Sequence, residues 1–194
     1  MKKYLVIGNP IEHSLSPKLH NYWFEKNNID ANYDRKKIDK SEIQKIISEI
    51  REDKLDGINV TVPFKTDVIP FLDTLSKESQ ITQSVNTIYK QDKKLIGHNT
   101  DIKGFELSLK ETQFNLENKT IFILGAGGVV PSIIYALEKL DVSKIIVSNR
   151  TKQKTENLKK YFSNISVVDW GDQPEFDIII NATSLGLNKE DNIG

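Results

Sequence analysis

Short apolar runs rich in β-branched residues alternate with helical patterns along most of this 194-residue chain. Each run is bounded by Gly, Pro, Asn or Asp, which is typical of short buried strands. We expect strands at residues 5–7, 57–62, 86–89, 120–124, 144–148, 166–168 and 177–180. We expect helices at residues 17–27, 41–51, 75–82, 102–110, 130–140 and 152–162. Alternation of this kind predicts an α/β fold built on mostly parallel sheets.

Two polar stretches divide this pattern. Residues 91–94 separate two short apolar segments and predict a hairpin inserted among the parallel units, which makes the first sheet mixed. Residues 111–119 precede the run at 120–124, and we place a domain boundary there. Residues 1–112 would then form a first α/β domain with a linking helix, and residues 113–194 a second domain.

Composition excludes several classes of function. Lys plus Arg and Asp plus Glu each total 27, so no global basic field favours nucleic acid or anionic lipid. The absence of cysteine excludes disulfides, thiolate nucleophiles and Cys-based zinc sites. The first apolar run, residues 4–7, is too short for a signal sequence or a membrane span. We therefore expect a cytoplasmic protein with a small-molecule partner, without nucleic acid or membrane.

A glycine-rich turn joins the expected strand at 120–124 to the helix at 130–140. In that context successive backbone amides can approach a pyrophosphate at the helix N-terminus, which predicts a Rossmann-like nucleotide-binding domain. The pattern departs from G-x-G-x-x-G because Val130 occupies the third glycine position. The alternative is a turn that only lets helix and strand pack closely. The predicted cofactor-binding residues of this turn are Gly125, Ala126, Gly127, Gly128 and Val129.

The end of the next strand indicates which dinucleotide is bound. An NAD-binding fold normally offers an acid to the ribose 2′-hydroxyl there, but this chain has Asn149, Arg150 and Thr151, with Lys154 one helical turn beyond Arg150. Arginine can bind a phosphate through two N–H groups, so we predict NADP. The alternative is a solvated basic helix start, although cations there oppose the helix dipole.

Polar residues also end the elements of the first half. Ser14 and Ser16 can both donate to a carboxylate, although Ser16 before Pro17 is also an ordinary helix N-cap. Lys65 follows an expected strand, at the sheet edge where open α/β folds bind ligands. Asn86 and Asp101 lie at the ends of later elements.

Seven ordered segments together resemble the shikimate dehydrogenase family. They are HSxSPxxHN at 13–21, NVTxPxK at 59–65, VNT at 85–87, GxNTDxxG at 97–104, GAGG at 125–128, NRT at 149–151 and NATxxG at 181–186. The resemblance implies reversible NADPH-dependent reduction of 3-dehydroshikimate to shikimate in chorismate and aromatic amino acid biosynthesis. It implies a shikimate-binding first domain and an NADP-binding second domain that is incomplete at its C-terminus.

The resemblance also implies the roles of individual residues. Ser14 and Ser16 would bind the shikimate carboxylate, and Lys65 and Asp101 would form the catalytic pair. The ring hydroxyls would be surrounded by Thr61, Lys65, Asn86 and Asp101. Thr183 and Ser184 follow the strand at 177–180 and would contact the cofactor, with a packed turn as an equal alternative. Chemically, oxidation of a secondary alcohol needs a proton acceptor at the hydroxyl as hydride departs.

Other expectations stay open at this point. Family members continue for several elements after NATxxG, so we expect a truncated chain that lacks one wall of its cleft. An NAD-preferring quinate/shikimate dehydrogenase and a non-catalytic binding module are the two rival functions. The histidines at 13, 20 and 98 lack metal-ligand spacing, so no metal is expected. Members of the family occur as monomers and homodimers.

Overall fold

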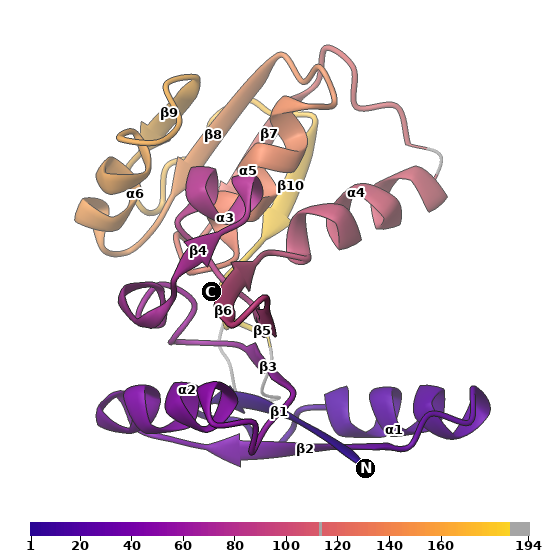
Figure 1. Cartoon of the computed structure of the whole chain (residues 1–194). Helices are drawn as coiled ribbons and strands as arrows, with labels where there is room; N and C mark the ends of the chain where they lie inside the picture. Colours follow the sequence, from indigo (N-terminus) through magenta and orange to yellow (C-terminus); the bar gives the residue numbers. More distant parts are fainter. Residues whose placement is uncertain (113, 187–194) are drawn as a thin grey trace. The chain divides into compact units, whose positions relative to one another are not determined.

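The computed structural model describes residues 1–112 and 114–186, which fall in two compact units (Figure 1). The units comprise residues 1–100 and 101–194, whereas the sequence predicted a boundary after residue 112. The difference is helix α4 (Asp101–Glu111), which packs against α5 (Val130–Glu138) of the second unit. No helix of the described ranges is both long and apolar enough to cross a membrane.

The first unit contains a six-stranded mixed sheet with the order β2-β1-β3-β5-β6-β4. Its strands are β1 (Lys2–Gly8), β2 (Ala31–Lys37), β3 (Gly57–Val60), β4 (Thr74–Leu75), β5 (Thr87–Gln91) and β6 (Lys94–His98). β1 runs parallel to β2 and β3, and β5 runs antiparallel to β3 and β6. The hairpin β5–β6 confirms the insertion that the polar stretch at 91–94 predicted.

Three helices accompany this sheet: α1 (Ser16–Lys26), α2 (Ile43–Arg51) and α3 (Lys77–Thr82). Short 3₁₀ turns at Lys40–Glu42 and Ile69–Phe71 complete the unit. Helix α2 shows why the sequence folds this way, because its isoleucines recur at helical spacing and all four are buried in the core of the unit: Ile43, Ile46, Ile47 and Ile50.

Sequence patterns missed strand β2. Its residues, ANYDRKK, are mostly polar, and only Tyr33 among them is buried. The strand forms because β1 offers a full parallel ladder, from Lys2 opposite Ala31 to Gly8 opposite Lys37. An edge strand can stay polar because only one of its sides is paired and little of it enters the core.

The second unit is a four-stranded parallel sheet with the order β10-β7-β8-β9. Its strands are β7 (Thr120–Leu124), β8 (Lys144–Ser148), β9 (Ile165–Val168) and β10 (Ile178–Asn181). The predicted strands at 120–124 and 144–148 are confirmed residue for residue. Helices α5 and α6 (Lys152–Leu158) end earlier than predicted, at residues 138 and 158.

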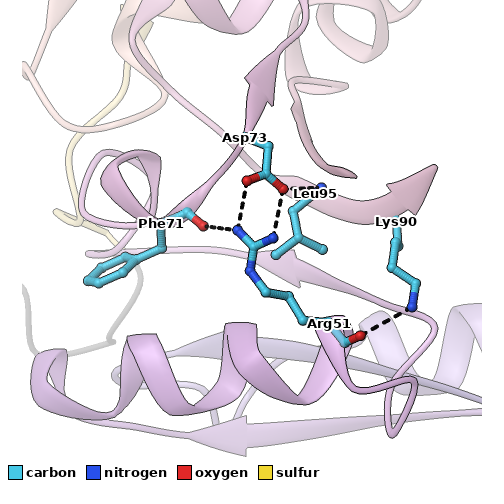
Figure 2. A network of polar contacts seen from close by, with 5 residues as sticks. All are labelled: Arg51, Phe71, Asp73, Lys90 and Leu95. Atoms are coloured by element: carbon cyan, nitrogen blue, oxygen red, sulfur yellow. Dashed lines mark hydrogen bonds and ion pairs between the residues drawn. The ribbon is translucent and has the colours of Figure 1, made fainter. Parts of the chain in front are cut away.

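One polar network joins elements of the first unit on its surface (Figure 2). The Arg51 guanidinium donates to both Asp73 carboxylate oxygens, at 2.8 and 2.9 Å, and to the Phe71 carbonyl at 3.2 Å. The Asp73 carboxylate also accepts from the Leu95 backbone N–H at 2.7 Å, and Lys90 Nζ donates to the Arg51 carbonyl at 3.2 Å. The guanidinium, followed by the Leu95 amide, lowers the Asp73 pKa to about 2. The network ties the end of α2 to the hairpin β5–β6.

Candidate active site

The predicted substrate-binding residues of the first unit gather at one edge of its sheet. Val60 lies opposite Ile7 in the parallel pair β1–β3, and Asn59 lies opposite Thr87 in the antiparallel pair β3–β5. Thr87 in turn lies opposite His98 in β6. The carboxyl ends of β1, β3 and β6 therefore meet the amino end of β5. The segments that carry Ser14, Thr61 and Lys65 leave the sheet there, and Asn86 directly precedes β5 at the same edge.

Asn86 is the centre of a hydrogen-bond network at this edge. The residue is only 8% exposed, and its backbone carbonyl accepts from the Val60 N–H at 2.8 Å. Asn86 Oδ1 accepts from the Thr100 backbone N–H and the Thr87 hydroxyl, both at 2.9 Å. Asn86 Nδ2 donates to Thr100 Oγ1 at 2.9 Å. The Asn86 amide is therefore fixed in orientation by Thr87 and by both the backbone and the side chain of Thr100.

The network extends toward helix α1 through Asn59 and Tyr33. Asn59 Nδ2 donates to the Asn86 carbonyl at 3.1 Å and to Thr87 Oγ1 at 3.0 Å. Asn59 Oδ1 accepts from the Tyr33 hydroxyl at 2.6 Å. Burial raises the pKa of Tyr33, and a side-chain hydrogen bond with Ser16 partly offsets this. Predicted substrate residues Ser16 and Asn86 are thus connected through residues that the sequence analysis did not name as site residues.

The two serines lie where β1 leads into helix α1. The helix begins at Ser16 with Leu15 as its N-cap, and the Leu15 side chain makes no capping hydrogen bond. The alternative that Ser16 is an ordinary N-cap is therefore wrong. Ser14 Oγ accepts from the Ser16 N–H at 3.3 Å, and Arg35 Nη1 donates to the Ser14 carbonyl at 3.3 Å. A guanidinium from β2 therefore reaches the loop that was predicted to bind a carboxylate.

Thr61 and Lys65 lie in the turn that follows β3. The strand ends at Val60, two residues before the predicted end, because the Phe64 N–H turns back to the Thr61 carbonyl at 3.0 Å. Lys65 is only 8% exposed, and its carbonyl accepts from the Val85 N–H at 2.9 Å, beside Asn86. Asp101 follows Thr100 in the chain and opens α4 in the second unit. The pairing of Lys65 with Asp101 stays a prediction.

In the second unit, the glycine-rich turn after β7 begins with a backbone conformation that favours glycine. Gly125 adopts a φ of +112°, and a Cβ there would lie 2.8 Å from the Ala182 carbonyl oxygen. The Gly125 N–H donates to the Ser148 carbonyl at 2.7 Å, which links the turn to β8. A Cβ on Gly127 would meet nothing within 4 Å, so that side of the turn is open to a ligand. Val130, the departure from the glycine pattern, is fully buried at the start of α5.

The predicted 2′-phosphate site lies at the end of β8. Arg150, Thr151 and Lys154 are exposed there, while Asn149 Nδ2 donates to the Thr151 carbonyl at 3.0 Å and shapes the turn. Lys152 differs from its neighbours, because its ammonium pairs with Asp169 at 2.6 Å. Within residues 1–112 and 114–186, neither Arg150 nor Lys154 has an acidic side chain in ion-pair range. These cations and hydroxyls fit the 2′-phosphate of NADP.

The turn after β10 is held by its own side chains. Thr183 Oγ1 donates to Asn181 Oδ1 at 2.7 Å and accepts from the Leu185 N–H at 3.0 Å. The packed-turn interpretation therefore accounts for the Thr183 side chain, while Ser184 is exposed. A cavity of about 480 Å³ opens beside the turn and is lined in part by Leu124, Trp170 and Thr183. A cofactor contact by Thr183 or Ser184 stays a prediction.

Two family models match the chain, one on each unit. The shikimate dehydrogenase substrate binding domain matches residues 6–88, and the shikimate / quinate 5-dehydrogenase domain matches residues 106–188. The chain belongs to the shikimate dehydrogenase family. Shikimate dehydrogenases are oxidoreductases, so the predicted enzyme class is confirmed.

Individual relatives agree with this membership. The shikimate dehydrogenase (NADP(+)) of Pelagibacter ubique is 59% identical over 192 residues, which cover 99% of this chain and 72% of that protein. The crystal structure of shikimate dehydrogenase from Aquifex aeolicus is 38% identical with a TM-score of 0.90, over 99% of this chain and 72% of that one. The Thermus thermophilus enzyme in complex with NADP(H) and shikimate is 31% identical with a TM-score of 0.86, over 96% and 70%. The predicted fold class is confirmed.

The structure adds residues to this shikimate dehydrogenase site that sequence reasoning missed. Asn59, Thr87 and Thr100 lie within motifs, close in sequence to predicted site residues, and this position could have identified them. Tyr33 had no such signal, because it stands alone in a polar segment outside every motif. Only the pairing of β2 with β1 brings its ring to the same edge of the sheet as Asn59.

Proposed function

We propose that this protein catalyses the reversible NADPH-dependent reduction of 3-dehydroshikimate to shikimate, a step of aromatic amino acid biosynthesis. Its membership of the shikimate dehydrogenase family and the NADP(+)-dependent relative at 59% identity support the activity and the cofactor. The structural observation that carries the proposal is the convergence of Ser16, Lys65 and Asn86 at one edge of the first sheet. Enzymes of this pathway typically work in the cytoplasm, which supports a cytoplasmic location.

The proton of the reacting hydroxyl is assigned to Lys65 and Asp101 together. When bound, NADP accepts the hydride that leaves the carbinol carbon of shikimate, and the hydroxyl proton must leave at the same time. A proton acceptor has to lie within hydrogen-bond reach of that oxygen. Burial of Lys65 supports the assignment, because a side chain removed from water is held in one position and interacts strongly with a polar substrate.

Binding of the substrate is divided among the remaining residues at the edge. The hydroxyls of Ser14 and Ser16 would donate to the carboxylate of shikimate, and the nearby Arg35 guanidinium adds a favourable positive potential. Thr61 and Asn86 would bind the ring hydroxyls. The fixed orientation of the Asn86 amide supports this role, because a pre-oriented amide loses little conformational entropy on binding.

The cofactor would be held mainly by backbone groups and by cations. Amides of the turn that follows Gly125, through Val129, would bind the pyrophosphate at the start of α5, where the helix dipole favours an anion, while Gly125 would shape the turn. Arg150 would bind the 2′-phosphate, with Thr151 and Lys154 beside it. These residues account for selection of NADP over NAD, since no carboxylate stands at the end of β8 to bind a free 2′-hydroxyl.

The activity is tested by following NADPH absorbance when the purified chain is mixed with shikimate and NADP. Lys65→Ala is expected to lower kcat by about 10²- to 10⁴-fold, the range of general acid–base contributions. Lys45→Ala is the matched control, because Lys45 is exposed on α2, outside the site, and its loss is expected to leave kcat unchanged. Undiminished turnover in Lys65→Ala would refute the assigned pair.

Two further measurements separate the rival functions. Catalytic efficiency with quinate and NAD, compared with shikimate and NADP, tests the rival enzyme, and a preference for NAD would contradict the role of Arg150. Calorimetry tests the non-catalytic rival, because binding of shikimate without turnover would show a binding module. Light scattering with and without ligand distinguishes a monomer from a homodimer.

A further inference from the structure

The Tyr33 phenol is held rigidly in the first unit although it lies on an edge strand. Its residue is only 4% exposed, and its backbone makes two hydrogen bonds with the Asn21 side chain, at 2.8 and 2.9 Å. The His20 ring stacks on the Tyr33 ring, with centroids 4.2 Å apart and planes 7° apart. The hydroxyl therefore has a defined position, 2.6 Å from Asn59 Oδ1.

The direction of this hydrogen bond follows from backbone groups. Asn59 Nδ2 donates to the Asn86 carbonyl, which can only accept, so the Asn59 amide cannot be reversed without losing that bond. Asn59 Oδ1 must then face the phenol, and an amide oxygen can only accept. The single proton of the Tyr33 hydroxyl is therefore donated to Asn59.

The same reasoning fixes the direction of the next two hydrogen bonds, between Asn59 and Thr87 and between Thr87 and Asn86. Asn59 Nδ2 also donates to Thr87 Oγ1 at 3.0 Å, which directs the proton of the Thr87 hydroxyl elsewhere. That proton goes to Asn86 Oδ1, at 2.9 Å. Hydrogen bonds thus run in one direction, from Tyr33 to Asn59, from Asn59 to Thr87 and from Thr87 to Asn86. We call these four residues the Tyr33 relay.

We propose that Tyr33 is a positioning residue of the substrate site, which orients the Asn86 amide through Asn59 and Thr87. The inference rests on the proposed function, which places Asn86 at the ring hydroxyls of shikimate. Without the phenol hydroxyl, Asn59 Oδ1 loses its donor, and the Asn59 side chain is held only by its hydrogen bonds to the Asn86 carbonyl and the Thr87 hydroxyl. The Thr87 hydroxyl, and through it the Asn86 oxygen, would then be positioned less firmly.

Burial of the Tyr33 ring helps to keep its hydroxyl protonated and therefore able to donate to Asn59. The pKa of Tyr33 is raised by desolvation, so the phenol stays protonated across neutral and moderately alkaline pH. The hydrogen bonds of the Tyr33 relay therefore keep their direction over the whole pH range in which a dehydrogenase assay is run.

Tyr33→Phe tests the proposal, because it removes one hydroxyl and keeps the ring that stacks on His20. We expect the KM for shikimate to rise about ten-fold, the size of one hydrogen bond to a site group, with kcat and the KM for NADP changed less than about two-fold. Tyr89→Phe is the control, since Tyr89 is exposed on β5 and lies outside the relay. A merely structural role would lower the melting temperature and leave the KM for shikimate unchanged, and that result would overturn the proposal.

A double-mutant cycle tests the route. Thr87→Val removes the hydroxyl that links Asn59 to Asn86, so Tyr33→Phe should raise KM by less than about two-fold in that background. A second ten-fold rise would show that Tyr33 acts by another route and would contradict the relay.

Failure of this inference can be told apart from failure of the proposed function. If the unsubstituted chain oxidises shikimate and Tyr33→Phe does so with the same KM, only the inference is wrong. If the chain binds shikimate without turnover, the calorimetric Kd replaces KM in the same comparison. If it neither turns over nor binds shikimate, the proposed function and the role of Tyr33 are both overturned.

Discussion

The two units hold their predicted ligands by different physical means. In the first unit the predicted residues Lys65 and Asn86 are both buried, and Thr87 and Thr100 fix the Asn86 amide through hydrogen bonds. In the second unit the predicted cations Arg150 and Lys154 are exposed, and the turn before α5 relies on backbone conformation at Gly125.

The contrast corresponds to the chemistry of the two ligands. A ring with several hydroxyls is distinguished from similar rings only by donors and acceptors at fixed positions, which requires packed and hydrogen-bonded side chains. A phosphate carries concentrated charge and many acceptor oxygens, so backbone amides and flexible cations suffice. Substitutions should therefore affect the two units differently.

The largest effect is expected at the backbone of the second unit. Gly125→Ala forces a Cβ into a left-handed conformation and against the Ala182 carbonyl, with an expected cost of about 1–3 kcal/mol before any steric relaxation. We expect a lower melting temperature and loss of NADP binding by calorimetry.

Gly127→Ala is the matched control for the backbone effect. A Cβ there has open space, so the melting temperature should stay the same, while NADP binding should weaken if the methyl group occupies the side on which the proposed pyrophosphate site lies. Equal melting temperatures for both variants would show that the conformation of Gly125 is not what shapes the turn.

An intermediate effect is expected from the exposed cations. Arg150→Ala should lower catalytic efficiency with NADP by about 10- to 100-fold, the range of a charge-assisted hydrogen bond, and should leave efficiency with NAD nearly unchanged. Lys152→Ala is the control, because the Lys152 ammonium is already paired with Asp169. An equal loss with both cofactors would mean that Arg150 does not contact the 2′-phosphate.

The smallest effect is expected from the surface network of the first unit (Figure 2). The pKa of Asp73 is lowered from 3.8 to about 2, so the stabilisation that it provides is complete above pH 4 and is lost as the pH falls toward 2. Thermal unfolding between pH 7 and pH 2.5 should therefore show a smaller drop in melting temperature for Asp73→Asn than for the unsubstituted chain. Because both partners are exposed, the difference should be slight, and identical drops would remove Asp73 from the acid response.

Local sequence patterns were sufficient for the strands of the second unit. The runs at 120–124 and 144–148 are apolar and β-branched, and both strands form at those residues because they are buried in a parallel sheet. The same reasoning failed for β2, whose polar residues give no apolar run. It also assigned Leu75 to the helix expected at 75–82, although Thr74–Leu75 form the short strand β4 beside β6.

The sequence by itself determined which residues are predicted to carry the chemistry. Motifs identified Lys65, Asn86 and Arg150, and the glycines between β7 and α5, because such residues are constrained by local conformation and by the groups that they offer to ligands. The tertiary structure decided how those residues are supported. Tyr33 and Asn59 are 26 residues apart, and Asn59 and Asn86 are 27 apart, so their hydrogen bonds exist only after strands β2, β1, β3 and β5 pair in register. Strand pairing depends on packing across the whole unit, and no local pattern encodes it.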